Sequence, residues 1–272
     1  MNPSTIPYYS FILLPYRMNE NLALLRKIAR ETAKFIRENV NKEGMEKTVM
    51  MGAYKSPTSR IDYETESFAL EIIKDETDWN VLTEERGFLD RKSEYTLVMD
   101  PVDGTYNAIH GIPYYAVSLA LYRGDICEAS TVINVPGNIE YYASLGGGAY
   151  RDGERISVRK LKKPYLFVVA LGESSSDFSA KLVRRARRIR SMGCASLEMI
   201  MVAEGVADLF LYDHTPKKLL RIVDIAASTL IVREAGGKVV DLNNRDLAMP
   251  LKVGVKENVM AYGDERVLEV IR

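Results

Sequence analysis

The sequence predicts an α/β protein of the layered, α+β type, and three observations support this fold class. The chain of 272 residues is long enough to bury a large core. Hydrophobic residues make up 47% and charged residues 27%, which is typical of globular proteins. Helical spacing precedes a dense set of strand patterns in the first half, whereas strands and helices alternate in the second half. Such a mixture favours stacked layers of sheets and helices.

The chain begins with two expected helices. Apolar residues recur at helical spacing from Asn19 to Asn39, and a second helix is expected from about Asp62 to Asp75. Residues 1–17 precede the first pattern and do not belong to it. We expect them to be an N-terminal extension of unknown role, or the product of an upstream start codon with Met18 as the true start.

Strand patterns dominate the middle of the chain. Two short apolar runs, at 80–83 and 95–99, come before three longer runs at 114–122, 126–135 and 138–145. Glycine and proline separate these longer runs, and a triple glycine follows the last one. This punctuation favours an antiparallel meander.

The second half is expected to alternate between strands and helices. The expected strands are 165–171, 206–212 and 238–242, and the expected helices are 176–189, 194–205 and 224–236. On the helix expected at 176–189, Leu182, Ala186 and Ile189 form an apolar stripe, which leaves the basic residues of the run 181–190 on a solvated outer face.

Charge and composition exclude several classes of protein. Lys+Arg and Asp+Glu both number 37, and a formal net charge of zero argues against a general nucleic-acid or membrane-surface binder. The longest apolar runs are too short to span a bilayer, and the N-terminal apolar patch lacks the basic start of a signal peptide. Two cysteines and two histidines exclude a Cys/His zinc site. We expect a reducing, cytoplasmic setting, with a regulatory Cys127–Cys194 disulfide as the alternative.

Two carboxylates follow the run at 95–99 in the segment 100-DPVDGT-105. Pro101 restricts the backbone so that Asp100 and Asp103 can converge on one side of the turn. Gly104 and Thr105 then open a helical turn to Ile109, whose free N–H groups suit a phosphate oxygen. An Asx-type turn that caps a short helix explains the same residues, so this segment alone leaves both interpretations open.

Two further acidic segments also lie at the junctions of expected elements. Glu84 and Glu85 follow the run at 80–83, and Asp224 begins a helix with an otherwise apolar face. Adjacent glutamates usually face solvent, and an aspartate at a helix start is commonly an N-cap. Three such segments together nevertheless match the oxygen ligands that Mg²⁺ requires.

The motif 100-DPVDGTYNAIHGIPYYAV-117, preceded by 83-TEE-85 and followed by 223-VDIAASTLIVREAGG-237, resembles the inositol monophosphatase family of Mg²⁺-dependent phosphatases. The details are most similar to archaeal members, which often act on both inositol monophosphates and fructose 1,6-bisphosphate. The resemblance covers residues 19–272 and implies an αβαβα sandwich that is usually dimeric. It further implies one phosphatase unit over 18–272, with a metal-binding, catalytic half at 18–160 and a substrate-side half at 161–272.

The resemblance also implies roles for individual residues. Two or three Mg²⁺ ions would be held by Glu84, Asp100, the carbonyl of Val102, Asp103 and Asp224. Glu84 is preferred to Glu85 because the family's ligand is the first glutamate of this pair. Asp62 and Thr105 would orient and help to deprotonate the attacking water, and Gly104 with Thr105 would bind the phosphate.

The substrate side departs from the animal members of the family. Gly193, Ala195 and Ser196 match residues that approach the sugar ring. Lys217 stands where animal inositol monophosphatases carry a glutamate that binds inositol hydroxyls, which argues against strict inositol specificity. Lys217, Lys218 and Arg221 are instead suited to a second phosphate, and the alternative is a solvated basic turn.

We therefore expect a Mg²⁺-dependent phosphomonoesterase that hydrolyses inositol 1-phosphate, fructose 1,6-bisphosphate or both. The alternatives are a 3′-phosphoadenosine 5′-phosphate phosphatase and a non-catalytic relative that acts as a binding or regulatory protein. The expected partners are a small phosphorylated sugar or polyol and a second copy of the chain in a homodimer, with no nucleic acid and no membrane.

Overall fold

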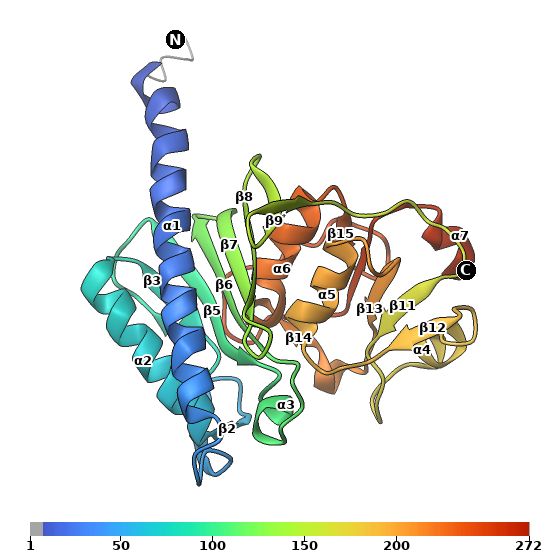
Figure 1. Cartoon of the computed structure of the whole chain (residues 1–272), viewed down its shortest axis with the longest axis horizontal. Coiled ribbons are helices and arrows are strands. Elements are labelled where there is room, and N and C mark those ends of the chain that lie inside the picture. The colour runs from blue at the N-terminus through green and yellow to red at the C-terminus, as the bar shows by residue number, and fades with distance from the viewer. Residues whose placement is uncertain (1–7, 272) are drawn as a thin grey trace.

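The computed structural model describes the backbone of residues 8–271, and the side chains of residues 20–271 except that of Lys217. Its elements stack in the order helix, sheet, helix, sheet, helix (Figure 1). Apolar clusters fill the spaces between successive layers. The structure therefore confirms the layered α/β fold class and the αβαβα order of layers.

Two helices form the first layer. Helix α1 spans Tyr8–Asn39 and helix α2 spans Arg60–Glu76, and fully buried residues such as Leu25 and Ile28 pack α1 against the first sheet. Helix α1 begins well before the expected start at Asn19, and its first turns extend beyond the layers in Figure 1. The expected role of residues 1–17 as a separate extension stays a prediction, because residues 1–7 and the side chains up to Asn19 lie outside the described structure.

The first sheet has eight strands in the order β10-β9-β8-β7-β6-β5-β3-β4. These are β3 (Asn80–Thr83), β4 (Gly87–Leu89), β5 (Tyr95–Asp103), β6 (Ala116–Arg123), β7 (Ile126–Asn134), β8 (Ile139–Ser144), β9 (Gly148–Arg151) and β10 (Glu154–Ile156). Antiparallel pairing from β5 through β8 confirms the meander, which β9 and β10 extend. Strand β3 pairs with β5 in parallel, so the carboxyl ends of these two strands lie side by side.

Strand β5 is longer than expected. It does not end at Met99 but continues to Asp103, and its pairing with β6 shifts register between Asp100 and Asp103. Such an irregularity re-aims side chains. The two aspartates therefore belong to a distorted strand end rather than to a separate turn.

Two buried helices form the middle layer, α5 (Ala195–Ala203) and α6 (Ile222–Glu234). Both confirm helices expected from the sequence. Helix α6 is apolar on all sides because it packs between the first sheet and the second half of the chain. Its first turn lies at the end of β14 (Leu220–Arg221), a short strand that pairs with β16 (Lys256–Glu257).

The second sheet has five strands in the order β12-β11-β13-β17-β15, and α4 (Asp177–Leu182) and α7 (Val267–Ile271) cover its outer face. The strands are β11 (Leu166–Val169), β12 (Arg188–Arg190), β13 (Leu209–Tyr212), β15 (Lys238–Val240) and β17 (Val259–Tyr262). A small hairpin of β1 (Thr48–Met51) and β2 (Pro57–Ser59) precedes α2. The division expected near residue 160 stays a prediction, although the two large sheets take their strands from either side of it.

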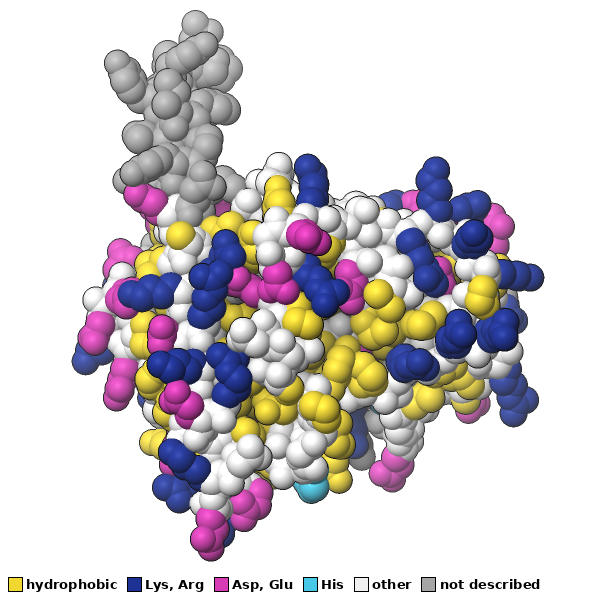
Figure 2. Space-filling model, in the orientation of Figure 1, with side chains coloured by type: hydrophobic (Ala, Val, Ile, Leu, Met, Phe, Trp, Pro, Cys, Tyr) yellow, Lys and Arg dark blue, Asp and Glu magenta, His cyan; other side chains and the backbone are white. Residues whose placement is uncertain are grey.

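The prediction of a helix over residues 176–189 is wrong. Helix α4 ends at Leu182, and Arg188–Arg190 instead form the edge strand β12, in which Ile189 pairs with Phe167 of β11. Charged residues on an edge strand discourage pairing with another chain. Lys and Arg side chains gather at this end of the molecule (Figure 2).

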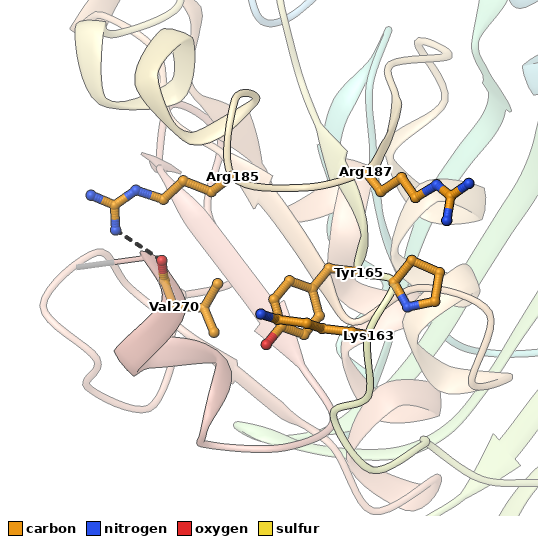
Figure 3. Close-up of a pocket in the computed structure, with 6 residues that line it drawn as sticks. Lys163, Tyr165, Arg185, Arg187 and Val270 are labelled. Atoms are coloured by element: carbon orange, nitrogen blue, oxygen red, sulfur yellow. Dashed lines mark hydrogen bonds between the residues drawn. The ribbon is translucent and has the colours of Figure 1, made fainter.

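A hollow of about 690 Å³ lies at this basic end (Figure 3). Arg185 donates a hydrogen bond to the carbonyl of Val270 across it (2.8 Å), and Lys163 lies over the ring of Tyr165. None of the residues that line this hollow was expected in the site.

Two expectations about cysteines and membranes can be compared with the structure. Cys127 and Cys194 are free thiols, so the alternative of a disulfide between them is not seen. Among the helices of the described residues, none combines the length and the apolar character needed to cross a bilayer.

Candidate active site

Three carboxylates from distant parts of the chain meet at the carboxyl ends of β3 and β5. Glu84 follows β3, Asp100 lies in β5, and Asp224 lies in the first turn of α6, which packs against β5. One oxygen from each of these side chains lies within 4.8 Å of the others. The structure thus brings together three of the residues expected to bind metal.

Burial opposes the negative charge of Glu84 and Asp100. Burial, opposed by the charge of Arg221 and reinforced by that of Asp224, raises the pKa of Glu84 to about 8. Burial and the neighbouring charge of Glu84 raise the pKa of Asp100 well above its usual value. Hard oxygen donors with excess negative charge suit Mg²⁺, so the residues present fit this ion.

Arg221 already contacts two of the three carboxylates. Its Nη1 donates to Oε1 of Glu84, its Nη2 donates to Oδ1 of Asp224 (2.6 Å), and its Nε lies 3.1 Å from both oxygens of Asp224. Burial lowers the pKa of Arg221, but Asp224 and Glu84 outweigh this effect and raise it well above its usual value. The residue expected to touch substrate thus lies among the carboxylates, although it also lines the adjoining cavity.

Asp103 lies outside this cluster of three and is hydrogen-bonded to the start of α5. Its Oδ2 accepts hydrogen bonds from the backbone N–H (2.7 Å) and hydroxyl (2.5 Å) of Ser196, and the thiol of Cys194 lies 3.1 Å away. Ser196 is fully buried, so its contact is with Asp103 rather than with the cavity. Asp103 itself lines the cavity, which leaves its expected contact with metal open.

Asp62 and Thr105 form a hydrogen-bonded pair beside this cluster. The hydroxyl oxygen of Thr105 lies 2.8 Å from Oδ1 of Asp62 and 2.9 Å from the carbonyl of Val102. The other oxygen of Asp62 accepts from the hydroxyl and backbone N–H of Ser59, which forms a capping box at the start of α2. Burial raises the pKa of Asp62, and the hydrogen bonds from Ser59 and Thr105 oppose this rise.

Gly104 directly precedes α3 (Thr105–Ile109) and has a backbone conformation that only glycine adopts easily, with φ at +89°. A Cβ atom here would lie 3.2 Å from the Cβ of Cys194 and 3.2 Å from the carbonyl oxygen of Tyr114. The glycine therefore allows the chain before α3 to touch the chain before α5.

The pair of glutamates divides between two environments. Glu84 points to Asp100 and Asp224, whereas Oε2 of Glu85 accepts a hydrogen bond from Thr58. Glu66 lies behind them, fully buried, and accepts from the hydroxyl of Thr83 (2.5 Å) and the N–H of Glu85 (3.0 Å). Burial raises the pKa of Glu85 to about 7. The preference for Glu84 in the cluster agrees with this geometry.

A cavity of about 450 Å³ adjoins the carboxylates. Of the residues expected on the substrate side, Gly193, Ala195, Lys218 and Arg221 line it. Lys217 lies in the short 3-10 turn η1 (Pro216–Lys218), and its side chain lies outside the described structure. The acidic cluster thus adjoins a cavity whose lining also includes the basic residues Lys218 and Arg221.

Several residues of the cavity were not expected from the sequence. They include Tyr54, Glu198, Tyr212, His214 and Lys256. Glu198 is 2% exposed, and burial raises its pKa to about 7. A lone acid in the apolar run 195-ASLEMIMVA-203 is a signal that could have found it. The others carry no local signal, because they come from loops and strand ends that only the fold brings together.

The sequence matches the inositol monophosphatase family over residues 18–271. It is 36% identical, over 260 residues, to the fructose-1,6-bisphosphatase/inositol-1-monophosphatase of Archaeoglobus fulgidus, covering 92% of this chain and 98% of that protein. It is 33% identical, over 269 residues, to the bifunctional NADP phosphatase/NAD kinase of Methanococcus maripaludis, covering 89% of this chain but 47% of that protein. The chain thus spans about half the length of the second relative.

A solved structure is similar in fold. It belongs to a Pyrococcus horikoshii protein described as having similarities to inositol-1 monophosphatase, with a TM-score of 0.80 and 30% sequence identity. The match covers 92% of this chain and 97% of that one. The likeness therefore extends over most of both chains.

Proposed function

The chain belongs to the inositol monophosphatase family, and from this premise we propose that it is a Mg²⁺-dependent phosphomonoesterase for small sugar or polyol phosphates. The observation that carries the proposal is the meeting of Glu84, Asp100 and Asp224 within 4.8 Å of one another. The proposed substrates are inositol 1-phosphate and fructose 1,6-bisphosphate, which agree with the names of the archaeal relatives.

Glu84, Asp100 and Asp224 would hold the metal, and Asp103 with the carbonyl of Val102 would complete sites for two or three ions. When bound, Mg²⁺ supplies a more acidic water and a positive charge that offsets the charge developing on the leaving oxygen. Phosphate monoesters hydrolyse very slowly in water, so strong electrostatic stabilisation is needed. The raised pKa values of Glu84 and Asp100 support this role, because a nearby cation favours the charged form of both groups.

The protein's own residues would position water and phosphate. If Thr105 donates its proton to Asp62, the remaining lone pairs of its hydroxyl can accept a hydrogen bond from the attacking water. The N–H groups at the start of α3, next to Gly104, are suited to bind phosphate oxygens. Gly193, Ala195 and the basic residues that line the cavity would then hold the sugar and any second phosphate.

A second candidate is removal of the 2′-phosphate of NADP⁺. The observation that favours it is the relative from Methanococcus maripaludis, whose matched part covers 89% of this chain. The cavity includes two tyrosine rings, Tyr54 and Tyr212, which suit a larger substrate than inositol. This candidate uses the same carboxylates and differs only in what occupies the rest of the cavity.

A substrate panel tests the proposal. Phosphate release would be measured with Mg²⁺ and with EDTA on inositol 1-phosphate, fructose 1,6-bisphosphate, NADP⁺ and 3′-phosphoadenosine 5′-phosphate. We expect Mg²⁺-dependent release, fastest with one of the first two compounds. Release from none of the four would favour the non-catalytic alternative.

We also propose that the protein works as a homodimer in the cytoplasm, which sedimentation and cell fractionation would test.

A further inference from the structure

The guanidinium of Arg221 bonds to the carboxylates that the proposed metal would need. Glu84 and Asp224 each contribute an oxygen to the cluster of three, and both accept hydrogen bonds from Arg221. The side chain of Arg221 is 19% exposed and that of Asp224 is 9% exposed, so little water screens the pair. Charge-assisted hydrogen bonds of this two-pronged kind are among the strongest in proteins.

The local structure explains why Arg221 takes this position. It ends β14, where pairing with β16 fixes its backbone, and it immediately precedes α6. Its own N–H donates to Oδ2 of Asp224 (2.6 Å), which closes the first turn of the helix. The side chain starts beside the carboxylates, and it also lines the cavity.

A dication and this guanidinium cannot share the same carboxylates without a penalty. Two cations a few ångströms apart repel each other strongly where water is scarce. The carboxylate oxygens that coordinate a metal also lose lone pairs to it, which weakens their hydrogen bonds to Arg221. Metal binding therefore has to break at least part of this ion pair.

We propose that Arg221 is an internal cation which Mg²⁺ must displace, and that the displaced guanidinium then holds an anionic group of the substrate in the adjoining cavity. This inference rests on the proposed function of the carboxylates as metal ligands. It assigns Arg221 two successive partners, first Glu84 with Asp224 and then substrate. It also predicts that metal binding favours substrate binding, because only the metal releases this cation.

Replacing Arg221 with glutamine tests the competition. Mg²⁺ alone would be titrated calorimetrically into the wild type and Arg221→Gln, without substrate. We expect the Kd for Mg²⁺ to fall about tenfold in the variant. The reason is that the net contribution of a charge-assisted pair of this kind corresponds to roughly a tenfold change in an equilibrium constant. The melting temperature in EDTA should fall by about 5 °C, since unpaired carboxylates remain, and saturating Mg²⁺ should remove most of that difference.

Arg159 offers a matched control. It forms a similar two-pronged pair with Asp208, with Nε to Oδ1 at 2.8 Å and Nη2 to Oδ2 at 2.5 Å, and neither residue lines the cavity. Arg159→Gln should lower the melting temperature equally with and without Mg²⁺ and leave the Kd for Mg²⁺ unchanged. Arg221→Lys keeps the charge without the fork, and its Kd should lie between those of the wild type and Arg221→Gln.

The outcomes separate the two proposals. An Arg221→Gln protein that binds Mg²⁺ as tightly as the wild type, or less tightly, overturns the competition. If the wild type also hydrolyses substrate with Mg²⁺, the proposed function stands while the role of Arg221 is wrong. A wild type that neither binds Mg²⁺ nor releases phosphate overturns both. A higher Kd for Mg²⁺ in Arg221→Lys than in the wild type would likewise contradict the competition.

Discussion

Replacing Asp100 with asparagine should remove activity and at the same time stabilise the metal-free protein. The side chain keeps its shape, and asparagine can still accept the hydrogen bond from the N–H of Val102 (3.1 Å). What disappears is a carboxyl group whose ionised form is disfavoured by burial and by the charges of Glu84 and Asp224, which have oxygens within 4.8 Å of its own. Two like charges at this separation repel by about 3 kcal/mol at an effective dielectric constant of about 20. Arg221 neutralises part of this repulsion and protonation of Glu84 or Asp100 relieves more of it, so a net gain of roughly 1–2 kcal/mol is expected in EDTA.

The two effects have separate assays. Such a gain raises the melting temperature of a chain of this size by roughly 3–6 °C in EDTA. Phosphate release with Mg²⁺ should fall by more than about a hundredfold, because even residues that only support a metal ligand commonly cost 10- to 100-fold. Asp125→Asn in the exposed turn between β6 and β7 is the control and should change neither quantity. Near-normal turnover in Asp100→Asn, or a lower melting temperature in EDTA, would refute the reasoning.

Two further changes test other parts of the site. Burial raises the pKa of Glu198 to about 7, above its usual 4.5, so its stabilising contribution is complete below the lower value and is lost as the pH rises through the higher one. The unfolding free energy of the wild type should therefore fall between about pH 5 and about pH 8, as measured by urea titration in EDTA. In Glu198→Gln this fall should be smaller by roughly 3 kcal/mol. Identical profiles for variant and wild type would contradict this. Gly104→Ala should cost about 1–3 kcal/mol and most of the activity, because strain at φ +89° adds to contacts of 3.2 Å. Gly124→Ala has a similar strain at φ +58° with nothing near its Cβ, so an equal loss of stability in both would exclude the close approach as the cause.

Local patterns predicted much of the fold. The run at 80–83 coincides with β3, and the punctuated runs after residue 114 form β6, β7 and β8 as an antiparallel meander. These segments succeed because their apolar period and their glycines agree with the burial that the sheet imposes. The order of the acidic segments along the chain also predicted which carboxylates meet, although only through a resemblance to a family.

The failures share a physical cause, which is dependence on distant partners. The run 181–190 satisfies a helical pattern locally, but pairing of Ile189 with Phe167 across the second sheet decides its conformation. Arg221 resembles a basic turn residue in sequence, while its partner Glu84 lies 137 residues away. Neither contact is reflected in the spacing of apolar residues nearby in the sequence, so no local pattern could have predicted either contact.

The sequence left open whether these carboxylates cap helices or belong to the site, and the structure shows that the two interpretations are compatible. Oδ2 of Asp62, Asp103 and Asp224 in each case accepts a backbone N–H at the start of a helix, from Ser59, Ser196 and Arg221 respectively. This bond satisfies a helix donor and uses the positive end of the helix to favour the charged form. In Asp62 and Asp224 the other oxygen turns toward the site, where it meets Thr105 and Arg221. Capping therefore fixes the orientation of the carboxylate, and the same residue can stabilise a helix and present an oxygen to a cation.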